Sequence, residues 1–304
     1  MAGVSKTELD VVLQAAKSIG FRTAATKLSS FCSSVLNRNA LQILTDTEIA
    51  EIAATLTRYR GDELFEKGNV PGFTISNDLN RNILISGLGG FLSHHNVNSR
   101  TIDRIQHHQD IRDSLMKLNS GHYLEAVAAA ILDERMEAGA ATTGSGDQGI
   151  DALGWSILFK LNEAFLERDN RTSFAPDAKV FAFASSKKSE TSGAKLKLIS
   201  PAMIRELIGG WVIQRSPVGA WADQGVKMLS PVQMIFVTTY RLSTKARSDC
   251  KRLGVQVWGL PELVYLVAEN APDSVFDASN GFIFSEREFH LWCDKYESSR
   301  LASS

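Results

Sequence analysis

The sequence predicts an α/β protein in which helices flank a mixed β-sheet, preceded by a mainly helical N-terminal region. Residues 6–60 keep the helical spacing of apolar side chains, whereas the second half alternates short apolar runs with helical segments. The 304 residues are also many for one compact domain. We therefore expect a mainly helical domain over residues 1–114 and an α/β domain over residues 115–304 that ends in a helical extension.

Composition and charge indicate an ordinary globular protein, with 44% apolar and 22% charged residues and a net charge of −1. Any nucleic-acid binding must therefore come from a local basic patch. The three cysteines lack the spacing of a zinc site or a disulfide framework, which fits a reducing cytoplasm. The sequence has no signal-peptide pattern and no apolar run that could cross a membrane, so we expect a cytoplasmic protein without membrane contact.

The N-terminal domain is expected to begin with a helix that Thr7 caps, with Asp10 at the capping-box position. Further helices are expected over residues 23–36, over 45–59 with Thr45 at the start, and over 99–118. A turn-rich break separates them at residues 69–80, and the glycines of residues 81–96 argue against one continuous helix there.

The α/β domain is expected to contain four strands, each of them a short apolar run. The predicted strands cover residues 150–156, 179–184, 232–238 and 255–258. Helices are predicted over residues 122–136, 158–168, 201–213, 243–253 and 260–268, and the tail over 300–304 is expected to be frayed.

Three side chains of this domain have the chemistry of a metal-dependent hydrolase. Glu125 lies near the start of a helix, Asp151 follows a glycine-rich turn, and Lys187 ends a predicted strand. Mg²⁺ prefers one or two carboxylates together with water and substrate phosphate. Asp151 and Glu125 could supply these carboxylates, and a lysine could polarise water or stabilise developing charge. Each residue alone has a simpler explanation, as a turn former, a solvated helix face and a strand end in solvent, but their order favours a site.

The same residues belong to a longer series of motifs. The series is Tyr123-Leu124-Glu125-Ala126, Gly146-Asp147-Gln148-Gly149-Ile150-Asp151, Ser185-Ser186-Lys187-Lys188, Ile204-Arg205-Glu206-Leu207-Ile208-Gly209 and Phe236-Val237-Thr238-Thr239. Over about residues 115–270 it resembles the Mrr-like branch of the PD-(D/E)xK restriction-endonuclease-like superfamily. The resemblance implies a restriction-endonuclease-like fold and a nuclease that uses Mg²⁺ or Mn²⁺ to cut DNA.

The resemblance also implies roles for individual residues. Asp151 would be the central metal ligand, Glu125 the helix acid and second ligand, and Lys187 the catalytic lysine. Asp147 matches a loop position that looks structural in the family, beside Gly146, Gln148 and Gly149.

The sequence departs from the family at the third site position. Ser185 stands where the family has glutamine or glutamate, so Ser185 and Ser186 are the candidates for this position. A serine hydroxyl is a weaker Mg²⁺ ligand than a carboxylate. The site could therefore be slower, differently tuned or inactive.

Basic residues cluster around the expected site, namely Lys188, Lys195, Lys197 and Arg205. They could contact the phosphates of DNA, or they could belong to an ordinary solvated loop, and the sequence favours neither explanation.

We therefore expect a DNA endonuclease, active in restriction or anti-phage defence by analogy, and a dimer because two cuts need two sites. The helical domain would choose the target, form oligomers or contact a partner. Two alternatives remain open: a non-catalytic nucleic-acid-binding or assembly module on a degenerate nuclease fold, and a nuclease subunit gated by a partner ATPase or sensor.

Overall fold

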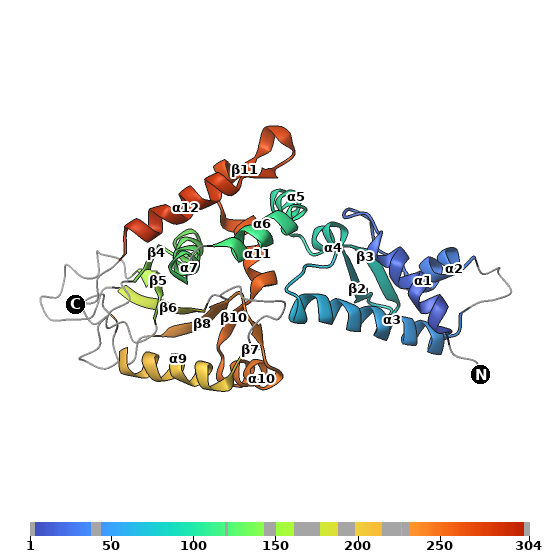
Figure 1. Ribbon diagram of the computed structural model, residues 1–304, viewed down its shortest axis with the longest axis horizontal. Helices are drawn as coiled ribbons and strands as arrows, with labels where there is room; N and C mark the ends of the chain where they lie inside the picture. The colour runs from blue at the N-terminus through green and yellow to red at the C-terminus, as the bar shows by residue number, and fades with distance from the viewer. Residues whose placement is uncertain are drawn as a thin grey trace, which may run out of the picture. The chain divides into compact units, whose positions relative to one another are not determined.

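The computed structural model describes residues 4–37, 44–118, 121–142, 150–160, 177–187, 198–214, 226 and 231–300 (Figure 1). At positions 65, 66, 157–160, 177–179, 187, 211, 213 and 214 it describes the backbone alone. The chain divides into two compact units, Met1–Gln109 and Asp110–Ser304. The boundary falls inside helix α6 (His108–Lys117).

The N-terminal unit combines helices with a small sheet that the sequence did not predict. Its larger helices are α1 (Lys6–Lys17), α2 (Leu28–Val35) and α3 (Asp46–Gly61). They share an apolar core with the sheet, which has the order β1-β3-β2 and antiparallel pairing. Its strands are β1 (Thr26–Lys27), β2 (Phe73–Asn77) and β3 (Ile83–Gly87). The expectation of a helix over residues 23–36 is wrong for its first turn, because Thr26 and Lys27 pair with β3.

Helix starts in this unit follow capping chemistry. Ser5, rather than the expected Thr7, caps α1, and its hydroxyl accepts from the amide of Glu8. The start of α3 is confirmed, since Thr45 forms the same capping box with Glu48. The unit continues with η1 (Asp62–Glu66), α4 (Leu88–His94) and α5 (Ser99–Ile105). The expected helix over 99–118 is thus two helices, α5 and α6.

A five-stranded mixed sheet forms the centre of the second unit, which confirms the α/β prediction. Its order is β10-β8-β6-β5-β4. The strands are β4 (Ala138–Ala141), β5 (Ala152–Lys160), β6 (Asp177–Lys187), β8 (Val232–Thr238) and β10 (Gln256–Trp258). Pairing is antiparallel from β4 through β5 to β6 and parallel from β6 through β8 to β10.

Helices cover both faces of this sheet (Figure 1). On one face lies α7 (Gly121–Arg135), with α12 (Glu286–Ser298) packed against it. On the other lie α9 (Pro201–Gln214) and α10 (Thr244–Leu253), whose apolar side chains meet Phe236 of β8. Helix α11 (Leu260–Asn270) packs against β10 and α7.

Small residues let α7 approach the sheet closely. A Cβ on Gly139 of β4 would lie 2.3 Å from the amide nitrogen of Asp133 and 2.6 Å from the carbonyl oxygen of Ala129. A Cβ on Gly154 of β5 would lie 3.1 Å from Cβ of Leu132. Glycine at these positions therefore sets the distance between the helix and the sheet.

Most predicted elements of this unit are confirmed, including the strand over 232–238 and the Ser243 cap of α10. Strand β4 was not predicted from the sequence. One prediction fails, because residues 158–160 extend β5 instead of starting a helix. The rest of that expected helix, residues 161–168, lies outside the described residues.

Smaller elements complete the unit. A second pair of strands joins β7 (Leu198–Ile199) to β9 (Arg241–Leu242). Between α11 and α12 lie η3 (Asp273–Val275), β11 (Phe276–Asp277), η4 (Ala278–Asn280) and β12 (Ile283–Phe284). Within the described ranges, every helix is too short or too polar to cross a membrane.

Candidate functional site

The candidate site lies at one edge of the five-stranded sheet. Because β6 and β8 are parallel, their carboxyl ends lie at this edge, and Lys187 is paired there with Thr238. Strand β5 runs the opposite way, so it begins at the same edge, with Ala152 paired to Ala184. Asp151 directly precedes β5. The topology therefore brings Asp151 beside residues 185–187.

Asp151 is tied to β6 through both its backbone and its side chain. Its amide donates to the carbonyl oxygen of Ala184 at 2.8 Å. Its Oδ2 accepts a hydrogen bond of 2.5 Å from the amide of Ser186. One such bond does not exhaust the acceptor capacity of a carboxylate, which offers about four lone-pair positions. The carboxylate of Asp151 is thus held at the strand end in a defined orientation.

The two serines of the third site position are both buried. Ser185 is 3% exposed and Ser186 is 6% exposed. Successive side chains of a strand point to opposite faces. Ser186 therefore shares a face with Ala182 and Ala184, the face that α7 covers. Among the described residues, Oγ of Ser186 finds no hydrogen-bond partner. A buried hydroxyl without a partner is costly, and at a functional site it is a group that a ligand or water would satisfy.

Glu125 reaches the same region from the first turns of α7, through an arginine. Nη1 of Arg300 donates to Oε2 of Glu125 at 2.7 Å and to the carbonyl oxygen of Thr142 at 2.6 Å. The amide of Thr142 in turn donates to the carbonyl oxygen of Asp151 at 3.1 Å. Nδ1 of His122 also lies 3.1 Å from Oε2 of Glu125. Glu125 and Asp151 are therefore joined through the guanidinium of Arg300 and the backbone of Thr142.

Sequence reasoning missed Arg300 and assigned it to a frayed tail. The structure corrects this, because Arg300 also bonds to Glu297 and to the carbonyl oxygen of His122. Burial acts to lower the pKa of Arg300, but the hydrogen bonds that it donates to Glu297 and Glu125 raise this pKa above its ordinary value. The guanidinium is therefore a permanent positive charge beside Glu125. An isolated arginine after a helix carries no sequence signal for a partner so distant in the chain.

The remaining predicted site residues are described only in part. Lys187 is placed by its backbone, while its side chain lies outside the description. Arg205 is exposed on α9. Gly146, Asp147, Gln148, Gly149, Lys188, Lys195 and Lys197 all lie outside the described residues. Within the described part of the chain, no three acidic, histidine or cysteine side chains gather in a way that could hold a metal.

The three cysteines are buried, and two of them have a raised pKa. Cys32, Cys250 and Cys293 form no disulfide. Burial raises the pKa of Cys250 to about 11, and it also raises the pKa of Cys293. A thiol with a raised pKa is a poor nucleophile near neutral pH, so Cys250 and Cys293 are poor candidates for nucleophilic catalysis.

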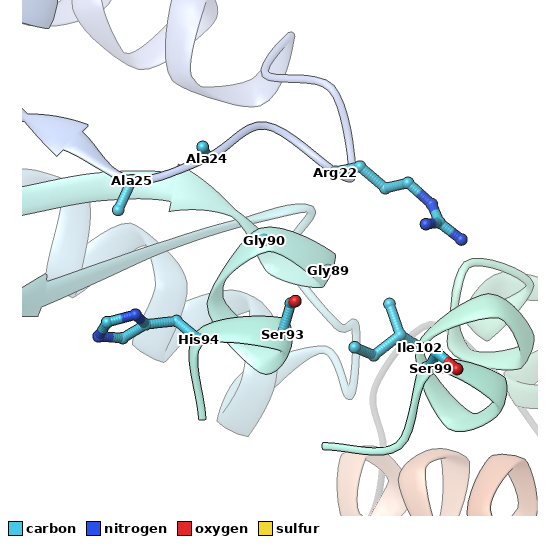
Figure 2. Close-up of a pocket in the computed structure, with 9 residues that line it drawn as sticks. All are labelled: Arg22, Ala24, Ala25, Gly89, Gly90, Ser93, His94, Ser99 and Ile102. Atoms are coloured by element: carbon cyan, nitrogen blue, oxygen red, sulfur yellow. The ribbon is translucent and has the colours of Figure 1, made fainter. Parts of the chain in front are cut away.

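The N-terminal unit has a separate cavity of about 420 Å³. Its lining consists of Arg22, Ala24, Ala25, Gly89, Gly90, Ser93, His94, Ser99 and Ile102. Figure 2 shows Arg22 reaching toward α5, where it forms an ion pair with Asp103, whereas His94 points the other way. The polar groups do not converge on one point, so the cavity does not define a ligand.

No family model matches the sequence, and no curated protein matches it. Among solved structures, a similar chain comes from the MspJI restriction endonuclease in complex with a 27-mer oligonucleotide. The two share 15% sequence identity with a TM-score of 0.41, over 69% of this chain and 41% of that one. This chain thus corresponds to less than half of that protein, and a likeness at this level carries no functional argument.

Proposed function

We propose that the protein is a divalent-metal-dependent DNA endonuclease with a restriction-endonuclease-like core. The observation that carries the proposal is the position of Asp151 at the sheet edge where β6 ends in Ser185, Ser186 and Lys187. Glu125 adds a second carboxylate, linked to this edge through Arg300. The choice of DNA rests on the sequence motifs that resemble the Mrr-like branch.

The oxygen atoms of this edge suit Mg²⁺ or Mn²⁺. Mg²⁺ keeps several waters and needs only one or two protein carboxylates beside a substrate phosphate. Asp151 would be the direct ligand, Glu125 would bind directly or through water, and the hydroxyls of Ser185 or Ser186 would occupy the third position. A bound metal would polarise the phosphodiester and lower the pKa of a water molecule.

The protein's own contribution would be orientation and charge. The backbone amide of Ser186 fixes the carboxylate of Asp151, which spares the side chain any reorganisation during the reaction. We assign to Lys187 the stabilisation of negative charge on the phosphate or the polarisation of the attacking water. Lys188, Lys195, Lys197 and Arg205 would contact DNA phosphates, and the loop with Gly146, Asp147, Gln148 and Gly149 would approach the backbone of the substrate.

Plasmid nicking with Mg²⁺ or Mn²⁺ tests this function. Asp151→Asn and Lys187→Met should each reduce nicking at least about 100-fold, the loss expected when a group that stabilises the transition state is removed. Asp113→Asn and Lys245→Met make the same chemical changes at a half-exposed position of α6 and an exposed position of α10, and they should leave activity unchanged. Equal nicking by all variants, or none by the wild type with either metal, would refute the proposal.

A second candidate is a non-catalytic nucleic-acid-binding or assembly module. It is favoured by Ser185 in place of an acid and by the ion pair that neutralises Glu125. Ser185→Glu and Ser185→Gln discriminate between the two. A gain of cleavage on either substitution supports a degenerate site, whereas a loss from an active wild type supports a working site that uses serine.

The biological setting that we propose is restriction or anti-phage defence, with the protein acting as a dimer. The N-terminal unit would select the target, form the dimer or contact a partner ATPase or sensor that gates cleavage. Sedimentation of the pure protein with and without DNA tests the dimer. DNA cleavage that appears only after the protein product of a neighbouring gene is added would support gating by a partner.

A further inference from the structure

Arg300 holds together three parts of the second unit. Its Nη1 bonds to Glu125 on α7 and to the carbonyl oxygen of Thr142 after β4. Its Nε and Nη2 bond to Glu297 on α12. The guanidinium is planar and rigid with five donors, so a single side chain can fix several acceptors in one geometry.

The pair of Arg300 and Glu125 is largely shielded from solvent. The side chains of Arg300 and Glu125 are each 13% exposed, which strengthens their interaction relative to a surface ion pair. The helix that leads to Arg300 is fixed independently, because the hydroxyl of Tyr296 donates to Oδ2 of Asp133 on α7 at 2.6 Å. Figure 1 shows α12 running along the same side of the sheet as α7. Helix α12, which is bonded to α7, therefore places Arg300 next to Glu125.

Thr142 links Arg300 to the edge of the five-stranded sheet where Asp151 lies. Its amide bonds to the carbonyl oxygen of Asp151, and its hydroxyl donates to the carbonyl oxygen of Ile150 at 2.6 Å. Thr142 is completely buried. The backbone immediately before Asp151 is thus fixed to Thr142, and the carbonyl of Thr142 is fixed by Arg300.

We propose that Arg300 is a positioning residue, which holds the carboxylate of Glu125 at a set distance from the backbone that carries Asp151. This role rests on the proposed nuclease function. Through it the C-terminal helix α12 becomes a support of the site, although its residues would not touch the substrate. A lysine could pair with Glu125 but could not hold Glu125, Glu297 and Thr142 in one plane.

The test uses the full chain with Arg300→Met and Arg300→Lys. Arg287→Met is the matched control, since Arg287 lies on α12 with a side chain that is 86% exposed. Hydrogen exchange is measured at the amides of Asp151 and Ser186, whose protection depends on the strand edge. Arg300→Met should accelerate exchange there by about tenfold or more, Arg300→Lys by less, and Arg287→Met not at all. Circular dichroism and thermal unfolding show whether Arg300→Met still folds. If it does not, hydrogen exchange at the same two amides is compared among the wild type, Arg300→Lys and Glu125→Gln.

Binding of Mn²⁺ alone, followed by electron paramagnetic resonance, separates positioning from plain stabilisation. Arg300→Met should weaken Mn²⁺ binding at least about fivefold relative to Arg287→Met, and Arg300→Lys should restore part of the affinity. Unchanged exchange, or Mn²⁺ affinity that is equal or higher in Arg300→Met, overturns the positioning role and leaves the nuclease proposal intact. A wild type that neither binds Mn²⁺ nor nicks DNA overturns the proposed function, and the positioning role with it.

Discussion

The backbone amide of Ser186 donates a hydrogen bond to Oδ2 of Asp151 across the ends of two neighbouring strands. The contact joins the residue just before β5 to the second-last residue of β6, so its backbone donor is fixed by the pairing of the two strands. A carboxylate oriented in this way keeps its geometry when its charge is removed. This allows the structural and chemical roles of Asp151 to be separated by mutation.

Asp151→Asn should therefore preserve stability while abolishing metal binding. Asparagine can still accept from the amide of Ser186, whereas Asp151→Ala removes the acceptor and should cost about 1–3 kcal/mol in the free energy of unfolding. Both variants should lose Mn²⁺ binding. Urea unfolding and electron paramagnetic resonance provide the two measurements. Retained Mn²⁺ binding in Asp151→Asn would exclude this carboxylate as the central ligand.

Ser186→Ala should leave the free energy of unfolding unchanged or raise it by up to about 1 kcal/mol. The hydroxyl is buried without a hydrogen-bond partner among the described residues, so its removal relieves a desolvation cost. Thr142→Val makes a comparable change where the hydroxyl does bond to Ile150, and it should cost about 1 kcal/mol. Chemical denaturation compares the two. If Ser186→Ala lowered the free energy of unfolding more than Thr142→Val does, the hydroxyl of Ser186 would have a hydrogen-bond partner after all.

Tyr296→Phe should reduce the sensitivity of the protein to alkaline pH. Burial, and then the hydrogen bond to Asp133, raise the pKa of Tyr296. Above the unfolded pKa of about 10, the unfolded chain loses a proton that the folded chain keeps, so stability falls as pH rises toward the folded pKa. The free energy of unfolding of Tyr296→Phe should be about 1–3 kcal/mol lower than that of the wild type at pH 8. Between pH 10 and about 11 it should then fall less steeply than that of the wild type. If the free energy of unfolding fell equally steeply with pH in both proteins, Tyr296 would not contribute to the alkaline sensitivity.

Gly139→Ala should destabilise the second unit by about 1–3 kcal/mol, because its new methyl group would collide with the backbone of α7. Gly209→Ala is the matched control: it lies on α9 with nothing within 4 Å of a new Cβ. There alanine should stabilise by up to about 1 kcal/mol through helix propensity. Thermal unfolding reports both changes. Equal effects would mean that α7 can shift away from β4 at little cost.

Short-range sequence patterns, such as capping residues and apolar runs, correctly predicted several helix starts and strands. Ser243 and Thr45 cap their helices as expected, and the apolar run of residues 232–238 forms β8. Asp151 and the end of β6 meet because strand direction follows from the order of the elements. The cap at Ser5 was missed because Thr7 offers the same chemistry two residues later.

Features that depend on distant pairing were not predictable. Strands β2 and β3 are short and lie in a segment rich in turn residues, so their pairing is decided by the core they join. The bond between Arg300 and Glu125 joins residues that are 175 positions apart, and nothing near either residue encodes it. The extension of β5 through residues 158–160 likewise depends on its pairing with β6, which overrides a helical spacing of apolar residues.

The separation of Glu125 and Arg300 along the chain has a consequence for biosynthesis. A ribosome releases α7 and the central strands before it releases Arg300, so the ion pair between Glu125 and Arg300 cannot form until α12 has been made. The strands of the sheet are therefore available to pair with one another before this contact exists.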